Sequence, residues 1–403
     1  MRRFIQYILK WLSIAVLAKY HPKIVAITGS VGKSSAKEAI ALVLSQKYPN
    51  EVRKSLKNLN NEIGVPLTII GGVDAKRNVF LWLVNFLRAV GLIVWPRARY
   101  PKILVLETAA DRPGDIGYLT SFIKPDMVVV TAIGEMPVHL EFFPERDDYI
   151  SEKVQLIKNL KPGGTAVLNY DDLTVRELRN RIPTGRERIY YGLQAGAEVR
   201  LVDFKFDLPA SASELGTAGI SFRIACAGET ASFKLPRTLG MPPLYAALAA
   251  VAVWIKFGLK LSDMAAALEK YQPLGGRLEL LVGLKETIII DDSYNASPLA
   301  TEAALDILER WHDHRKIAVL GSMRELGINT EAAHCLAGKK AALVADMLVL
   351  VGDEMVFAKE EAAKFGRKLG ADLFWFETAD EAKLKVQELL RSGDVVLIKG
   401  SRS

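Results

Sequence analysis

The chain has 403 residues, of which 50% are hydrophobic, 25% charged and 8% aromatic. At about 100–200 residues per domain, this length predicts two or three domains with ample chain for a core. Two cysteines are too few for a disulfide scaffold or a cysteine-built zinc cluster, and they favour a reducing, cytoplasmic compartment. The net charge of +7 is compatible with anionic substrates and with nucleic acid, so the charge alone does not distinguish these two classes of partner.

The first twenty residues predict a short apolar helix. Residues 4–19 are mostly apolar, but a membrane-spanning helix needs about 20 apolar residues, and Lys10 interrupts this run. On a helix, four polar residues form one narrow stripe: Arg3, Gln6, Lys10 and Ser13. The segment is expected either to lie in a membrane interface or to pack on the next domain. A signal peptide is the weakest interpretation, because no A-x-A-like cleavage site follows.

A second apolar stretch covers residues 79–95, and Arg88 again interrupts it. Asn78, Asn85 and Arg88 fall on one face of a helix with this spacing. A buried helix is one interpretation. The other is an exposed apolar surface shared with residues 4–19, which would dock on a membrane or on another subunit.

A glycine-rich turn joins the β-rich segment 23–28 to a segment with helical spacing. Strand, turn and helix form the layout that a phosphate-binding loop requires, because backbone N–H groups and the helix N-terminus then face the anion. Lys33 would place its charge at the β- and γ-phosphates, and the Ser34 hydroxyl suits Mg²⁺. The alternative is a tight turn with a chance Gly-Lys-Ser, since the first glycine of the general pattern would fall at Ile27. The predicted nucleotide-binding residues are Gly29, Ser30, Val31, Gly32, Lys33, Ser34 and Ser35.

The run Thr28-Gly29-Ser30-Val31-Gly32-Lys33-Ser34-Ser35 resembles the phosphate loop of the Mur ligase family, and the resemblance extends over nearly the whole chain from about residue 22. It is strongest to the MurF type, which joins UDP-N-acetylmuramoyl-tripeptide to D-alanyl-D-alanine. The resemblance implies an α/β fold with a central P-loop ATPase domain built on a parallel sheet (21–274). A Rossmann-like α/β domain would follow (275–403), and a short apolar helix would precede both (1–20).

The resemblance also implies Mg²⁺ ligands. Glu107 ends an apolar strand, where a carboxylate is well placed for a metal. His139 matches the family's T-x-I-G-x-x-H-x-E pattern, with two extra residues before the histidine. Lys153 corresponds to a lysine that is carbamylated in several members and then holds a second Mg²⁺, although Gln155 replaces the family's glutamate. Without the resemblance, these residues would be a helix-capping acid, a structural histidine and a solvated lysine.

Further residues would contact the nucleotide and the incoming amine. They are Asn169, Arg277, Asp292 and Asn295 for the nucleotide, and Lys399 within Lys399-Gly400-Ser401-Arg402 for the amine. The chain departs from the family at Pro242, Pro243 and Ala246, where polar side chains normally hold the adenine, so base specificity stays open. The segment Asn58–Pro66 also resembles the MurF type; taken alone, it predicts a polar loop running into a strand.

The implied activity is that of an ATP- and Mg²⁺-dependent amide ligase that works through an acyl phosphate. Its catalytic residues would be Lys33, Lys153, His139, Arg277 and Lys399. Its partners would be a muramyl-peptide-like carboxylate acceptor and an amino acid or dipeptide amine, with no nucleic acid.

The short segment before residue 22 leaves the acceptor open. Only about twenty residues precede the first strand, where MurF-type relatives carry a UDP-binding domain. The alternatives are a ligase of the same fold with a lipid-linked acceptor or another amide-linked polymer as substrate, and an inactive nucleotide-binding scaffold. The expected location is the cytoplasm, with peripheral contact at the inner face of the membrane through residues 4–19 and 79–95.

Overall fold

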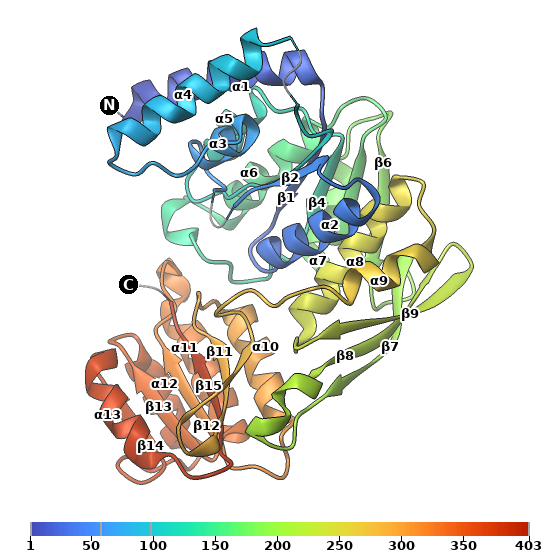
Figure 1. The fold of residues 1–403 in the computed structure, drawn as a ribbon. Helices are drawn as coiled ribbons and strands as arrows, with labels where there is room; N and C mark the ends of the chain where they lie inside the picture. Colours follow the sequence, from blue (N-terminus) through green and yellow to red (C-terminus); the bar gives the residue numbers. More distant parts are fainter. Residues whose placement is uncertain (1, 57–58, 97–98, 402–403) are drawn as a thin grey trace.

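The computed structural model describes residues 2–56, 59–96 and 99–401, which form two sheets covered by helices (Figure 1). Asn58 of the predicted Asn58–Pro66 motif and Arg402 of the predicted amine-binding motif lie outside the described residues. The mixed α/β class with two large, mainly parallel sheets agrees with the prediction. The boundary between 274 and 275 stays a prediction.

The first sheet has the strand order β2-β3-β1-β4-β5-β6-β7-β8-β9. Its strands are β1 (Lys23–Thr28), β2 (Val52–Lys54), β3 (Ile103–Glu107), β4 (Met127–Val130), β5 (Thr165–Asn169), β6 (Glu187–Gly192), β7 (Val199–Asp207), β8 (Gly219–Cys226) and β9 (Glu229–Pro236). From β2 to β7 in this order, each strand pairs in parallel with the next. The pairs β7–β8 and β8–β9 are antiparallel. The sequence did not predict this antiparallel extension.

Helices cover both faces of the first sheet, which explains why its central strands are continuous apolar runs. They are α1 (Arg2–Tyr20), α2 (Lys33–Lys47), α3 (Gly64–Ile70), α4 (Val79–Val94), α5 (Asp115–Thr120), α6 (Arg146–Lys158), α7 (Leu173–Glu177), α8 (Met241–Lys256) and α9 (Ala265–Leu268). Successive β1 side chains point to opposite faces: Val25 and Ile27 join the core formed with α2 and α8, while Ala26 joins the core formed with α6.

The second sheet has the order β10-β11-β15-β12-β13-β14 and is parallel except for β10. Its strands are β10 (Glu279–Val282), β11 (Ile288–Asp292), β12 (Lys316–Gly321), β13 (Met347–Val351), β14 (Leu373–Phe376) and β15 (Val395–Lys399). Its helices are α10 (Pro298–Glu309), α11 (Thr330–Val344), α12 (Met355–Lys364) and α13 (Ala379–Leu389). This is the alternating βα organisation expected of a Rossmann-like unit.

The expected strand after the Asn58–Pro66 segment is wrong, because these residues begin helix α3. Asn61 Oδ1 accepts the backbone N–H groups of Ile63 (3.2 Å) and Gly64 (2.9 Å), which caps the start of the helix. Every residue of α3 is buried, so its sequence has no polar face to reveal helical spacing.

Most of the stretch 79–95 forms helix α4 (Val79–Val94), but the interpretation as a buried helix is wrong. Asn78 caps α4 by accepting the N–H of Leu81 over 3.1 Å. Asn85 is buried whereas Arg88 is exposed, so the predicted common polar face is split. In the described part of the chain, neither this helix nor any other has the length and apolar character needed to cross a membrane.

Candidate active site

The glycine-rich turn lies between β1 and α2, as the sequence predicts. Gly29 has φ +142°, and a Cβ there would meet the Thr131 hydroxyl at 2.0 Å, so this position requires glycine. Gly32, with φ +87°, is the residue before the first turn of α2. The Lys33 ammonium donates to the carbonyl oxygens of Gly29 (2.9 Å) and Ser30 (3.1 Å). Lys33 therefore lies folded back over the loop that an anion would occupy.

Ser34 and Glu107 meet where the phosphate loop reaches the end of β3. Ser34 Oγ donates to Glu107 Oε1 over 3.1 Å, and Asn60 Nδ2 donates to the same oxygen over 3.4 Å. Among the described residues, Glu107 Oε2 accepts no hydrogen bond, although the Lys37 ammonium lies 3.4 Å away. A buried carboxylate oxygen beside a hydroxyl is a donor set that suits Mg²⁺. In the described ranges, no three His, Cys, Asp or Glu side chains form a metal-binding group.

Lys153 is buried under the phosphate loop. Its ammonium donates to the Gly29 carbonyl over 3.2 Å and lies 4.2 Å from the centre of the Tyr149 ring. Burial lowers the pKa of Lys153 to about 7, against the opposing influence of Asp111 and Glu152. Burial and the neighbouring Lys153 charge likewise lower the pKa of Lys33. Lys153 therefore has a large uncharged fraction near neutral pH, which a solvated lysine does not.

His139 lies between two acids from different parts of the chain. Its Nε2 is 3.5 Å from Asp111 Oδ1, and its Nδ1 contacts the Glu325 carboxylate, which follows β12 in the second sheet. The backbone of His139 is left-handed, with φ +71°, which is uncommon for residues other than glycine. Burial lowers the pKa of His139, and the two carboxylates oppose this shift. Asp111 follows β3 of the first sheet, and Glu325 follows β12 of the second sheet. Because His139 contacts both acids, it lies near both sheets.

The second sheet contributes Arg277 to this region. Arg277 Nη2 donates to Ser34 Oγ over 3.1 Å, and its guanidinium stacks 4.1 Å from the centre of the Tyr294 ring. Lys399 instead pairs with the Asp292 carboxylate and donates to the Asn295 carbonyl over 3.0 Å. Burial lowers the pKa of Lys399 and raises that of Asp292.

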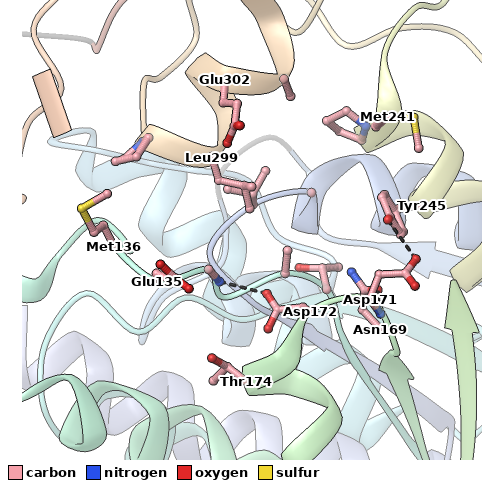
Figure 2. Close-up of a pocket in the computed structure, with 18 of the residues that line it drawn as sticks. Glu135, Met136, Asn169, Asp171, Asp172, Thr174, Met241, Tyr245, Leu299 and Glu302 are labelled. Atoms are coloured by element: carbon pink, nitrogen blue, oxygen red, sulfur yellow. Dashed lines mark hydrogen bonds between the residues drawn. The ribbon is translucent and has the colours of Figure 1, made fainter. Parts of the chain in front are cut away.

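A cavity of about 1110 Å³ opens between the two sheets beside the phosphate loop (Figure 2). Val31 and Gly32 line it together with Asn169, Pro242 and Ala246. Eight predicted nucleotide-contact residues are absent from its lining: Gly29, Ser30, Lys33, Ser34, Ser35, Arg277, Asp292 and Asn295. Pro243, the third departure from the family pattern, is buried in α8 instead. Only some of the predicted nucleotide-binding residues therefore line the cavity, and the others lie around Lys399 and Ser34.

Two acids that follow β5, Asp171 and Asp172, hold the walls of this cavity in place. Asp171 accepts the Tyr245 hydroxyl over 2.9 Å, and Asp172 accepts the backbone N–H groups of Ile133 and Gly134 over 2.8 and 2.9 Å (Figure 2). Figure 2 also shows Glu302, from the second sheet's helix α10, facing the first sheet's side of the cavity across the gap.

Sequence reasoning missed Tyr149 and Glu325. Tyr149 stands four residues before Lys153 on α6, so helical spacing alone pairs them, and its hydroxyl contacts Ser30 Oγ over 2.8 Å. Nothing local in the sequence links Glu325 to His139, because the two residues are 186 positions apart. Only the packing of the second sheet on the first brings these two together.

Two family models match the chain. The Mur ligase middle domain matches residues 96–254, and the Mur ligase glutamate ligase domain matches residues 276–402. A Mycobacterium tuberculosis UDP-N-acetylmuramoyl-tripeptide–D-alanyl-D-alanine ligase is 31% identical over 404 residues, which cover 94% of this chain and 70% of that protein. The Bacillus subtilis protein of the same name is 29% identical over 400 residues, covering 98% and 76%.

Solved structures agree with these matches. MurF from Acinetobacter baumannii superposes with a TM-score of 0.78 at 26% identity and covers 98% of this chain and 77% of that one. MurF from Thermotoga maritima, solved in complex with ADP, has a TM-score of 0.76 at 26% identity, covering 98% and 80%. The similarity therefore spans both sheets and the segment between them.

Proposed function

Because the chain belongs to the Mur ligase family, we propose that it is an ATP-dependent ligase that joins the carboxylate of a muramyl tripeptide precursor to D-alanyl-D-alanine. One observation carries this assignment beyond the fold. The Ser34 hydroxyl of the phosphate loop lies within hydrogen-bond distance of Glu107 from the first sheet and of Arg277 from the second. A phosphate-binding loop, an acid suited to Mg²⁺ and a guanidinium thus meet at one point, as phosphoryl transfer requires.

The first chemical step is phosphoryl transfer to the acceptor. An oxygen of the acceptor carboxylate forms a bond to the γ-phosphorus of ATP, and the bond from that phosphorus to the β,γ-bridging oxygen breaks. ADP leaves with the electron pair, and an acyl phosphate remains. Lys33 would leave the Gly29 and Ser30 carbonyls to contact the phosphates, while Arg277 would balance the charge on the transferred group.

The second step forms the amide. The amine nitrogen of the dipeptide bonds to the acyl carbon, the nitrogen gives up a proton, and the carbon–oxygen bond to phosphate breaks. A neutral amine is required, and the buried Lys399–Asp292 pair lies at the carboxyl ends of β15 and β11, where an incoming amino group would be held. Lys399 would act in this step by binding the carboxyl end of the dipeptide or orienting Asp292.

The residues at the loop fit Mg²⁺. Ser34 Oγ and Glu107 would hold one ion, which, when bound, neutralises negative charge on the nucleotide phosphates. His139 and Lys153 would serve a second ion if Lys153 carries a carbamate. For that modification the neutral Lys153 amine adds to CO₂, an N–C bond forms, and one proton goes to solvent. A pKa of about 7 for Lys153 favours this reaction at neutral pH.

The alternatives that the sequence left open are not favoured. An inactive scaffold would have no need of Lys33, Glu107 and Arg277 gathered around Ser34. A ligase for another amide-linked polymer or for a lipid-linked acceptor would use the same two steps, but the relatives that the chain matches are named for the muramyl-tripeptide and D-alanyl-D-alanine reaction.

The decisive experiment measures phosphate release from ATP and Mg²⁺ with UDP-N-acetylmuramoyl-tripeptide and D-alanyl-D-alanine supplied together or singly. We expect release that requires both substrates, together with one equivalent of the joined product by mass spectrometry. Release that neither compound stimulates would contradict the assigned substrates. A screen of other carboxylate acceptors would then separate a change of substrate from a loss of ligase activity.

We place the enzyme in the cytoplasm and propose peripheral contact with the inner face of the membrane through residues 4–19 and 79–95. Large apolar side chains of both segments are exposed, among them Trp11 and Phe80. The substrates named above would reach the enzyme from solution, so this contact is separate from the ligase chemistry.

A further inference from the structure

Helices α1 and α4 pack together at the edge of the molecule farthest from the second sheet (Figure 1). The Lys19 ammonium donates to the carbonyl oxygens of Leu92 (2.8 Å), Ile93 (3.0 Å) and Trp95 (2.7 Å), and the Tyr20 hydroxyl donates to Leu92 as well. A cation that satisfies the last carbonyls of a helix also complements its dipole. The end of α1 is thus fixed to the end of α4, so the two helices form one surface.

Both helices turn polar side chains inward. Ser13 of α1 is fully buried, and Gln6 of the same stripe donates to Glu62 over 2.8 Å. Asn85 of α4 is 1% exposed, where it accepts the Val73 N–H over 3.0 Å and donates to the Val73 carbonyl over 2.9 Å. A surface helix of a water-soluble protein normally does the reverse and turns its polar side chains outward.

The outward side of the two helices is apolar. We call this surface the α1/α4 face, and its large exposed side chains are Phe4, Tyr7, Trp11, Val79, Phe80, Leu83, Val84, Leu87, Val90, Val94 and Trp95. Phe80 is 70% exposed and Leu87 62%. The positions 80, 83, 87, 90 and 94 follow helical spacing, so they form a continuous stripe rather than the scattered apolar residues of an ordinary surface.

The charge of the α1/α4 face decides between the partners that an apolar surface can have. Neither helix contains an Asp or Glu, and the first acidic residue of the chain is Glu38. Exposed basic residues lie on these helices or in the loop before α4, against one exposed acid in that loop, Asp74; the basic residues include Arg3, Lys76, Arg77 and Arg88. A second copy of the chain would bring the same basic side chains together across the contact. An anionic surface complements them, and the exposed Tyr7, Trp11 and Trp95 suit a lipid–water boundary.

We propose that the α1/α4 face is a docking site for a bilayer that contains anionic phospholipid, with both helices lying in the interface. The apolar stripe enters the boundary between headgroups and acyl chains, and the four basic side chains contact lipid phosphates. This inference deepens the membrane contact proposed above and rests on that part of the proposed function. It does not depend on the ligase reaction.

The test is vesicle co-sedimentation of the full chain without ATP or substrates. The probes are phosphatidylcholine vesicles with and without phosphatidylglycerol. The double variant Leu83→Gln/Leu87→Gln removes exposed apolar side chains from the face without a change in charge. A matched control, Leu369→Gln/Leu384→Gln, changes two leucines near the second sheet that are somewhat more exposed. All four side chains are at least half exposed, so both variants should fold, which circular dichroism checks.

We expect the wild-type chain to bind the anionic vesicles and to be released by added salt. The Leu83/Leu87 variant should bind about ten-fold or more weakly, whereas the control variant should bind like the wild type. The proposal is overturned if wild-type protein stays in solution, if the two variants bind alike, or if vesicles without phosphatidylglycerol bind equally well. A concentration-dependent dimer that the Leu83/Leu87 variant loses, without vesicle binding, would assign the face to self-association. Phosphate release with both substrates would then still establish the ligase.

Discussion

Arg277 Nη2 donates a hydrogen bond to Ser34 Oγ over 3.1 Å, which joins the second sheet to the first turn of the phosphate-loop helix. The guanidinium is held in this position by its stacking on Tyr294, whose ring centre lies 4.1 Å away. A planar cation that reaches the phosphate loop from another part of the chain is suited to the charge that develops during phosphoryl transfer. Its effect should therefore fall on the rate more than on nucleotide affinity.

Arg277→Ala should lower kcat about 10²–10³-fold, because a preorganised donor to the transferred phosphate is lost. The dissociation constant for ATP, measured by fluorescence titration or calorimetry, should change much less. Arg277→Lys should recover little activity, since an ammonium lacks the planar fork. Arg310→Ala is the matched control, because Arg310 also stacks on an aromatic ring but packs on Phe206, away from the loop. Equal losses in the two variants would argue against a role for Arg277 in transfer.

Lys33→Ala should abolish ATP turnover and leave the fold intact. Burial and the Lys153 charge already lower the pKa of Lys33, so removal of its amine costs the folded state little. Turnover should fall about 10³-fold or more in a coupled assay, because the β- and γ-phosphates lose their contact with the lysine. Lys47→Ala, at the exposed end of the same helix, should behave like the wild type. Substantial turnover by Lys33→Ala would remove the claim that this loop binds the phosphates.

Glu107 should serve stability as well as catalysis. It is 3% exposed, and its Oε2 lies 3.4 Å from the Lys37 ammonium, which is 2% exposed. The Lys37 ammonium also lies 3.5 Å from Glu38 Oε1, so Glu107→Ala removes one of two carboxylates beside this buried cation. The substitution should lower the free energy of unfolding by about 2–3 kcal/mol. Urea unfolding measures this change.

Lys37→Met/Glu107→Gln separates the two roles of Glu107. The double variant removes the buried cation and the carboxylate charge together, so it should recover much of the stability lost in Glu107→Ala. It should stay inactive, because the acid suited to Mg²⁺ is gone. Recovery of activity along with stability would show that Glu107 has only a structural role.

The phosphate loop and the strands around it were predictable because their signals are local. The run from Lys23 to Ser35 contains a β-rich segment, two glycines and a helix start within thirteen residues, and the structure has all three. The α3 segment was mispredicted for an equally local reason, since complete burial removes the polar positions that reveal helical spacing.

Contacts between distant segments could not be read from the sequence. Glu325 faces His139 because the second sheet packs on the first, and no spacing rule relates the two positions. The inward orientation of Ser13 and Asn85 has the same origin. A helical wheel identifies a polar stripe and an apolar stripe, but tertiary packing alone decides which of them faces water.

Lys153 provides the last prediction, which combines activity with pH. Lys153→Ala should lose activity that short carboxylic acids partly restore, because the acid would occupy the place of the proposed carbamate. Lys158→Ala, on the exposed side of the same helix, is the matched control. If short acids restore nothing, the carbamate role is wrong.

The stability of the unmodified protein should also depend on the Lys153 amine. Its pKa falls from 10.5 in the unfolded chain to about 7 in the folded one, mainly because it is buried. Between these values the unfolded state binds the extra proton, so the free energy of unfolding should rise as the pH increases from 7 to about 10.5. Below pH 7 the Lys153 amine is protonated in both states. The full cost of burying its charge then lowers the free energy of unfolding. Urea titrations of CO₂-depleted protein should therefore show a steeper rise with pH for the wild type than for Lys153→Met. Parallel curves would mean that the Lys153 amine does not titrate in this range.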